Sequence, residues 1–272
     1  MKKTIINKIE HYRELIRALI TYMEDLIKFH IHKVLKWKHF KDLRQFKDKY
    51  KNQRCFILGT GPSLAIDDIE KLKNEKTFAV NSFIKALGEI SYRPTFYGFI
   101  DGVCMELYGE EILSSGIHNI FFTKRDDLKK ENYHKLNKSG AYELPQMNTR
   151  EWVYYAPKMP RAFSKDISKE TYWGYTVVYT MMQVAAYMGF TEMYLLGMDC
   201  CYMPGVECFK DMRSPDEIKS GLFLGKNDEV EKYIIAHKAV KKYADSQGIK
   251  IYNATRGGAL EVFPRVDLDD IL

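Results

Sequence analysis

The sequence has few cysteines and no arrangement that would pair them. Its five cysteines are an odd number and include no CxxC pair, and adjacent Cys200 and Cys201 are poorly placed to bridge each other or to chelate one metal ion. Without a secretory signal, we expect reduced thiols in a cytoplasmic protein with no bound metal. No apolar run approaches the roughly 20 residues that a membrane-spanning helix needs. No internal repeat is visible.

The formal charge of +6 is unevenly spread along the chain. Residues 1–53 hold 14 Lys and Arg against 6 Asp and Glu, whereas the remainder holds 28 against 30. Because the larger part is nearly neutral, the charge gives no reason to expect a nucleic-acid partner. A hydrophobic share of 46% is enough for a sizeable core. We divide the chain into a basic amphipathic arm over 1–50 and an α/β domain over 51–272.

The arm is predicted to be helical over residues 4–50. Apolar residues recur there at three- and four-residue spacings, and neither Gly nor Pro interrupts them. Lysines crowd the second half, together with Trp37 and Phe40. The apolar side of such a helix can pack on its own domain or on a partner subunit, which would make a homo-oligomer. A basic amphipathic helix of this kind also suits an anionic membrane surface, and nucleic acid is the least favoured partner. Attachment to the inner face of the cell membrane is therefore an alternative to a purely cytoplasmic location.

From residue 54 onward, short apolar segments alternate with helical ones. Strands are predicted over 54–58, 77–80, 95–100, 119–123, 193–196 and 250–252, with helices over 66–73, 175–188 and 229–247. This alternation predicts a Rossmann-like, mostly parallel sheet with helices on both faces. The stretch 124–170 is predicted as loops, and residues 200–228 as a lid.

Polar residues follow four of the predicted strands. The first set lies in a glycine-rich turn between a strand and a helix, where a nucleotide can approach the backbone closely. The others fall at the carboxyl edge of the sheet, where open α/β folds bind ligands. The turn is neither GxGxxG nor a P-loop, so a tight structural turn is the alternative. The predicted nucleotide-binding residues are Gly59, Thr60, Gly61, Ser63, Asn81, Asp101 and Asp199.

Four segments together resemble a known family. They are GTGPSL, FAVN, FYGFID and GYTVVYTMMQVAAYMGFTEMYLLGMDCCY, and the resemblance covers roughly residues 54–263. The pattern is similar to the bacterial CMP-sialic acid-dependent sialyltransferases (glycosyltransferase family 42), and more so to the motility-associated-factor and MptE-like proteins of the DUF115 group. The resemblance implies transfer of a sialic acid-like (nonulosonic) sugar from a CMP donor to a bacterial surface glycan precursor, without a metal cofactor.

The resemblance also implies roles for individual residues. Thr60, Asn81, Tyr175 and Thr176 match positions that contact the nucleotide or the sugar. Asp101 replaces a family Asn and is a departure. A family Tyr that binds the leaving phosphate aligns with Cys201 or Tyr202, and Tyr202 is the candidate carried forward.

The family's general base is a lid His, and this chain has none between Asp199 and Tyr233. His237 is the leading candidate, because an imidazole near its ordinary pKa of about 6.5 can accept a proton from a hydroxyl. Glu231 is the alternative base, and a surface helix His with no role is the simplest interpretation of His237.

Two other functions fit the same residues. An MptE-like diphosphokinase would move pyrophosphate from ATP to a pterin alcohol, with Asp101 and Asp199 as Mg²⁺ ligands. A non-catalytic member of a glycan-assembly complex would keep the fold and lack the base. Asp199 also fits a buried structural role.

Overall fold

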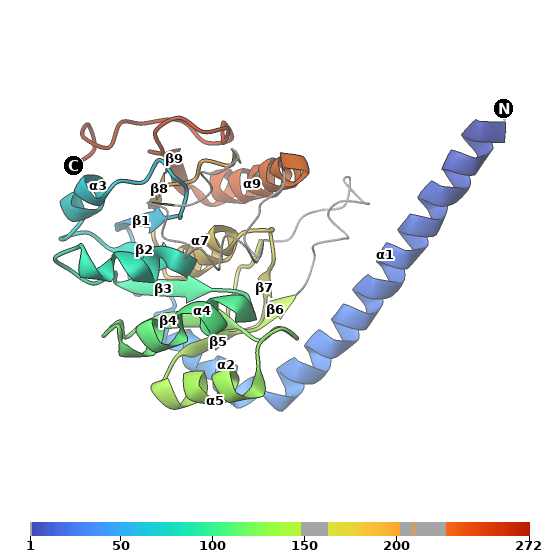
Figure 1. Cartoon of the computed structure of the whole chain (residues 1–272), viewed down its shortest axis with the longest axis horizontal. Helices are drawn as coiled ribbons and strands as arrows, with labels where there is room; N and C mark the ends of the chain where they lie inside the picture. Colours follow the sequence, from blue (N-terminus) through green and yellow to red (C-terminus); the bar gives the residue numbers. More distant parts are fainter. Residues whose placement is uncertain (1, 148–162, 202–208, 210–226) are drawn as a thin grey trace.

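The core of the molecule is a single parallel sheet. The computed structural model describes residues 2–147, 163–201, 209 and 227–272 (Figure 1). Seven strands lie in the order β5-β4-β3-β2-β1-β8-β9, and every neighbouring pair is parallel. The prediction of a Rossmann-like fold is confirmed. The strands are β1 (Arg54–Leu58), β2 (Thr77–Val80), β3 (Phe96–Phe99), β4 (Ile120–Thr123), β5 (Tyr142–Leu144), β8 (Glu192–Leu196) and β9 (Lys250–Asn253).

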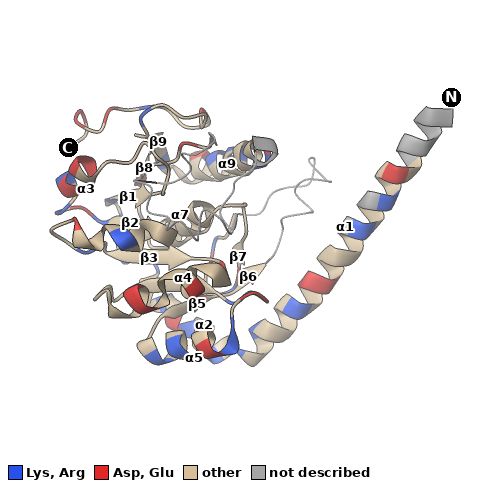
Figure 2. Cartoon of the chain, in the orientation of Figure 1, with Lys and Arg blue, Asp and Glu red and all other residues tan. Residues whose placement is uncertain are grey.

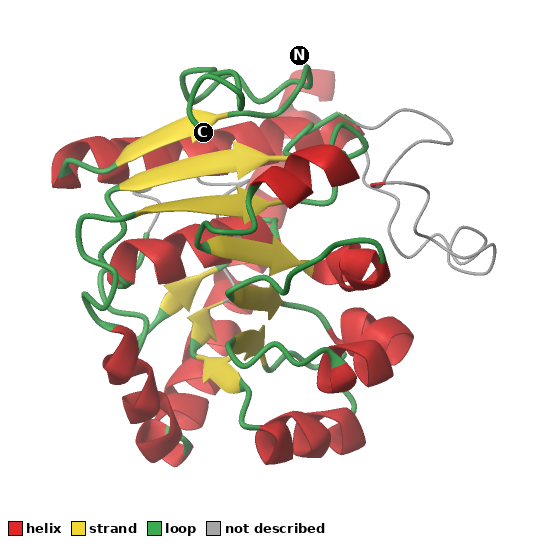
Figure 3. Ribbon diagram, turned by 90° about the vertical axis from the view of Figure 1, so that its left-hand side faces the viewer, coloured by secondary structure: helices red, strands yellow, loops and turns green. Residues whose placement is uncertain are grey.

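Helices cover both faces of this sheet, as Figure 3 shows. Successive strand side chains point to opposite faces, so Ile57 belongs to one core cluster and Phe56 to the other. The first cluster is closed by α7 (Val177–Tyr187) and α9 (Asn227–Gln247). The second is closed by α3 (Ile66–Lys71), the 3-10 helix η2 (Asn81–Gly88), α4 (Gly102–Ser114) and α5 (Lys130–Ser139). Burial on both faces explains why the strands read as continuous apolar runs.

Part of the loop prediction is wrong. The stretch 124–170 contains α5, β5 and the short strand β6 (Gln146–Met147), which pairs in parallel with β7 (Thr171–Tyr172) just after it. Helix α5 escapes detection because Leu136 is its one buried residue, so it has no apolar stripe. Residues 148–162 lie outside the described part of the chain. So do 202–208 and 210–226, which hold most of the predicted lid and Tyr202.

The N-terminal arm is helical, but its helix is shorter than predicted. Helix α1 (Lys2–Leu35) projects from the body (Figure 1), and the chain leaves helical geometry at Lys36, where ψ is 12°. Two short helices follow, α2 (Trp37–Lys41) and the 3-10 helix η1 (Asp42–Phe46). Their side chains Phe40 and Phe46 are each 1% exposed and belong to the first core cluster, where Phe46 packs on Phe121 of β4 and Tyr142 of β5. Residues 37–46 therefore pack as part of the globular body.

An acidic residue anchors the base of α1. The His32 Nε2 atom lies 2.5 Å from Glu143 Oε1, and the Tyr133 hydroxyl donates to Glu143 Oε2 at 2.6 Å. Burial would raise the pKa of Glu143, but the hydrogen bonds from His32 and Tyr133 outweigh it and lower that pKa below its ordinary value. The contact ties the base of α1 to β5 and α5.

Across the described residues, no helix is both long enough and apolar enough to span a bilayer.

Candidate functional site

The strand order reverses between β1 and β8, which makes a topological switch point there. From β1 the chain builds outward through β2 to β5, and then returns to place β8 on the other side of β1. Open α/β sheets bind ligands in the crevice at this point, beyond the carboxyl ends of the strands. Asp101, Asn81, Thr60 and Asp199 follow the four adjacent strands β3, β2, β1 and β8. With strands about 4.8 Å apart, this row of residues is about 14 Å long.

The glycine turn after β1 packs directly against the end of β8. The Gly59 amide donates to Leu196 O at 2.8 Å, and the Gly61 amide donates to Gly197 O at 2.9 Å. A Cβ at Gly59 would lie 2.4 Å from Gly197 O, and one at Gly61 would lie 1.8 Å from Asp199 Oδ2. Neither glycine is among the described residues with a positive φ. Close contact with β8, rather than a special backbone angle, therefore requires glycine here.

Asp199 is held by contacts from two sides. The Ser63 hydroxyl donates to Asp199 Oδ2 at 2.8 Å, and the Ala259 amide donates to the Asp199 carbonyl at 2.7 Å. The side chain is 7% exposed, and burial raises its pKa although the Ser63 hydrogen bonds oppose this. The structure thus joins Gly61, Ser63 and Asp199, all predicted to bind nucleotide, with a C-terminal turn that sequence reasoning did not include.

Asn81 has both backbone strain and an unused polar atom. Its φ is +47°, a conformation that is uncommon outside glycine. The Tyr97 hydroxyl donates to its carbonyl at 2.5 Å. Its side-chain Oδ1 is buried and has no hydrogen-bond partner among the described residues. Strained residues and unsatisfied polar atoms cluster at ligand sites, so Asn81 is the strongest single indicator of a ligand here.

Asp101 has a structural role that the sequence did not reveal. It is the N-cap of α4, where its Oδ1 accepts a hydrogen bond from the Cys104 amide at 3.0 Å. Burial raises the pKa of Asp101, and the Cys104 amide opposes that rise. One carboxylate oxygen is therefore committed to the helix start.

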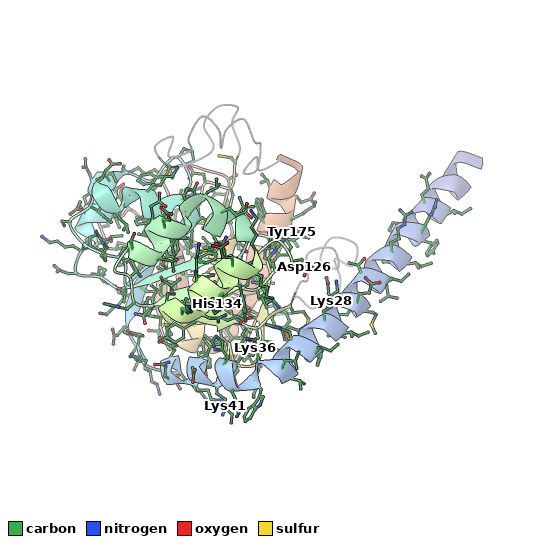
Figure 4. All side chains as sticks on the ribbon, turned by 60° about the horizontal axis from the view of Figure 1, so that its bottom comes forward. Lys28, Lys36, Lys41, Asp126, His134 and Tyr175 are labelled. Atoms are coloured by element: carbon green, nitrogen blue, oxygen red, sulfur yellow. The ribbon has the colours of Figure 1, made fainter. Side chains whose placement is uncertain are left out.

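The turn before α7 carries the second strained residue of the site. Tyr175, which is labelled in Figure 4, has a φ of +70°. It is buried against the rings of Trp173 and Tyr233. Thr176 caps α7 by accepting from the Tyr179 amide at 3.2 Å. Gly174 is required because a Cβ there would lie 2.2 Å from the Tyr179 ring. Cys200, after β8, is a third residue with positive φ, at +48°, and its half-exposed neighbour is Cys201.

Arg125 is a site residue that the sequence analysis missed. It follows β4, one strand beyond Asp101, and its guanidinium stacks 4.5 Å from the centre of the Trp173 ring. Its charge also acts to lower the pKa of Asp101, which places it near that carboxylate. The rule that selected the other residues, a polar group shortly after a strand, would have selected Lys124 and Arg125 after Ile120–Thr123.

His237 lies in the core and not on the surface. It is fully buried, its Nδ1 donates to the Tyr233 carbonyl at 2.7 Å, and its Nε2 has no partner among the described residues. Burial lowers its pKa to about 4, so the ordinary pKa that suggested a base is not kept. Glu231 is exposed on the same helix, two residues before Tyr233, which touches Tyr175.

With this geometry described, the family can be assigned. The family model described as "6-hydroxymethylpterin diphosphokinase MptE-like" matches residues 29–205. The chain belongs to this family. The matched segment runs from the base of α1 through the glycine turn to the end of β8 and Asp199, so it contains the switch point and all four residues of the polar row. The sequence matches none of the curated proteins.

Solved structures share the fold of this MptE-like protein. An MAf glycosyltransferase from Magnetospirillum magneticum AMB-1 is 13% identical, with a TM-score of 0.50 over 86% of this chain and 38% of that one. The chain therefore spans less than half the length of that enzyme. A sialyltransferase from Campylobacter jejuni, solved with cytidine-5'-monophosphate, is 18% identical, with a TM-score of 0.48 over 79% of this chain and 85% of that one. The likeness to the MAf glycosyltransferase, with its TM-score of 0.50, shows that the two proteins share a fold.

Proposed function

We propose that this MptE-like protein is a glycosyltransferase that moves a sialic acid-like (nonulosonic) sugar from a CMP-activated donor to a bacterial surface glycan precursor. The observation that carries the proposal is the row of polar residues at the switch point, above all the buried and unpartnered Oδ1 of Asn81. A row about 14 Å long suits an elongated ligand laid across the strand ends. The glycosyltransferase-like fold agrees with this assignment.

The donor lies with its nucleotide at β1 and β8 and its sugar toward β4. The phosphate sits at the glycine turn, near the Thr60 backbone, and Asn81 donates or accepts at the ribose or phosphate. Arg125 then meets the carboxylate of the sugar, since guanidinium groups bind carboxylates through paired hydrogen bonds. Stacking on Trp173 and an ion pair between Arg125 Nε and Asp127 Oδ1 at 3.6 Å hold the guanidinium in place.

The acceptor base in this proposal is Glu231. The first turns of α9 lie beside Tyr175 through the Tyr233 ring, and Glu231 is exposed there, whereas His237 is sealed in the core. A base must reach the acceptor hydroxyl within hydrogen-bond distance. An exposed carboxylate at the start of α9 meets that requirement better than a buried imidazole.

The second candidate is a diphosphokinase, and the family match is the observation that favours it. Under the diphosphokinase hypothesis, Asp101 and Asp199 hold Mg²⁺. Their strands are three positions apart, about 14 Å. Mg²⁺ binds its ligands at about 2.0–2.1 Å, so strands this far apart disfavour a single ion shared by both carboxylates. A kinase would need other ligands or separate ions, which makes the transferase the better-supported function.

Thermal unfolding with a panel of nucleotides separates these functions. The experiment compares CMP, CTP, UDP, GDP, and ATP with and without Mg²⁺. A ligand at about 100 times its Kd raises the free energy of unfolding of the protein by about 2.7 kcal/mol. Stabilisation by CMP supports the transferase. Stabilisation that requires ATP and Mg²⁺ supports the kinase. No response to any nucleotide leaves the non-catalytic member of a glycan-assembly complex.

Asn81→Gly tests the carrying observation. Glycine tolerates the positive φ of this position, so the change removes the amide without adding backbone strain. We expect CMP affinity to fall about tenfold, the equivalent of about 1.4 kcal/mol, while the melting temperature of the free protein changes little. Calorimetric titration measures the affinity. An unchanged Kd would remove Asn81 from the site.

Arg125→Gln tests the position of the sugar. The proposed contact involves the sugar carboxylate alone, so the affinity for the CMP-sugar should fall about tenfold while the affinity for free CMP stays the same. Lys124→Gln is the matched control, because that neighbouring side chain is exposed and lies over Tyr133 instead. Equal losses for CMP and for the CMP-sugar would show that Arg125 contacts the nucleotide.

A further inference from the structure

The chain bends where α1 meets the globular body, and large apolar side chains are exposed at this bend. Val34 is 71% exposed, Leu35 is 76% exposed and Trp37 is 49% exposed. Ile31, one turn earlier on α1, is 56% exposed. At about 100° per residue, Val34 and Leu35 lie about 60° and about 40° to either side of Ile31, so these three share one side of the helix. Apolar side chains exposed together in this way mark an interaction surface.

The basic charge of the arm is concentrated at the same bend. Residues 30–51 hold eight Lys and Arg against two Asp, a net charge of +6, whereas residues 1–29 hold six Lys and Arg against four Asp and Glu. Figure 2 shows basic residues on α2 and α5 at this end of the body, and Figure 4 labels Lys36 and Lys41 there. The last acidic residues before the bend, Glu24 and Asp25, lie about 9–11 Å from Ile31 along the axis of α1. The exposed apolar side chains are therefore set in a basic surrounding.

Two lysines lie beside the exposed Trp37 ring. The Lys41 Nζ atom is 3.8 Å from the centre of that ring, and the Lys38 Nζ atom is 6.0 Å from it. All three residues belong to α2 and are exposed. Phe40, on the same helix, is 1% exposed, so its packing in the core holds α2 on the body while the indole and the two ammonium groups stay in solvent. The charge and the apolar surface thus occupy one rigidly held place.

The mixture of side chains indicates what kind of surface binds here. An anionic bilayer attracts Lys and Arg, and it takes aliphatic and Trp side chains into the region between its headgroups and acyl chains. A nucleic acid would pair with the charges but would leave Val34 and Leu35 in water. A second copy of the chain, with its own bend turned toward this one, would set like charges against each other. Of these three partners, the bilayer alone engages both kinds of side chain.

We propose that the bend is a docking site for an anionic lipid bilayer. The docking surface, which we call the elbow, consists of Ile31, Val34, Leu35, Trp37, Lys38 and Lys41. The apolar side chains enter the headgroup region, while the two lysines keep their ammonium groups at the lipid phosphates. Because Phe40 packs α2 into the core, a docked elbow holds the globular body at the bilayer. The proposal does not depend on which reaction the switch-point site carries out.

Co-sedimentation of the full-length chain with vesicles tests the charges of the elbow. We expect binding to vesicles of phosphatidylcholine and phosphatidylglycerol at low salt, and much weaker binding at high salt or to phosphatidylcholine alone, because the attraction is screened or absent. The double variant K38Q/K41Q should weaken binding at least about tenfold, since each Lys near an anionic surface contributes about fivefold. The matched control K73Q/K238Q removes the same charge from exposed positions just after α3 and on α9, and should change binding less than about twofold.

Trp37→Ser tests the apolar part of the elbow without changing its charge. We expect vesicle binding to fall at least about fivefold, because the indole no longer enters the headgroup region. Leu35→Ser, on α1 before the bend, should act in the same direction, and circular dichroism checks that both variants are folded. An unaltered protein that ignores anionic vesicles at low salt would overturn the proposal. So would tighter binding to poly(U) RNA than to vesicles, with vesicle binding unchanged in both serine variants, which would assign the basic charge to nucleic acid.

Discussion

Gly61→Val is expected to remove nucleotide binding and to weaken the fold at the same time. The added side chain begins at a Cβ that would lie 1.8 Å from the Asp199 carboxylate and 2.7 Å from the Gly197 carbonyl. Neither group is the end of a long flexible side chain, so the β1 and β8 turns must move apart. We expect CMP affinity to fall at least about tenfold and the free energy of unfolding to fall by about 1–3 kcal/mol.

Gly88→Val is the matched control for this prediction. Gly88 ends η2, its φ is not positive, and a Cβ there meets nothing within 4 Å. Its effect on stability should stay within about 0.5 kcal/mol, as for other surface changes, and CMP binding should be unaffected. Chemical denaturation and calorimetric titration give both quantities. A Gly61→Val protein that binds CMP normally would show that the β1 turn lies outside the nucleotide site.

The elements of the sheet could be predicted because the signal is local. Each strand is buried on both faces, so Arg54–Leu58 and Thr77–Val80 stand out as apolar runs between polar turns. Helix α7 is visible for the same reason. Where an element is short or buries little, the apolar pattern is too weak to predict it. Helix α5 buries a single leucine, and β5 is three residues long. The end of α1 at Leu35 has no Gly or Pro to mark it and is set by the packing of Phe40 and Phe46 on the body.

The composition of the site could be predicted, but not the contacts within it. The carboxyl-edge rule placed Asn81, Asp101 and Asp199 after strands without knowledge of the strand order. The order itself depends on long-range pairing, and it separates Asp101 from Asp199 while it joins Asp199 to Gly61 and Ser63. The burial of His237 likewise depends on how α9 packs against α7, which the spacing of its own residues does not determine.

His237 is expected to make the protein sensitive to acid rather than to carry out catalysis. Burial lowers its pKa to about 4 in the folded state, against about 6.5 when unfolded. Between these values the unfolded chain binds a proton that the folded protein excludes, so stability falls as the pH falls from 6.5 toward 4. The difference between the two pKa values corresponds to a loss of about 3 kcal/mol in the free energy of unfolding. His237→Phe, which suits the neighbouring rings of Tyr179 and Phe263, should flatten that part of the pH profile.

Glu231→Gln is expected to lower kcat by about 10²–10⁴-fold, the usual contribution of a general base, and to leave donor affinity nearly unchanged. The substitution keeps the size of an exposed side chain and removes its ability to take the acceptor proton. His237→Phe serves as the comparison, and it should retain turnover near neutral pH because its imidazole is enclosed by the core. Initial rates with a CMP-sugar donor, at saturating donor and acceptor, measure both. If His237→Phe folds and binds donor but loses turnover while Glu231→Gln does not, the imidazole is the base and α9 must move to expose it. If neither change matters in an active enzyme, proton transfer to α9 is not part of the reaction.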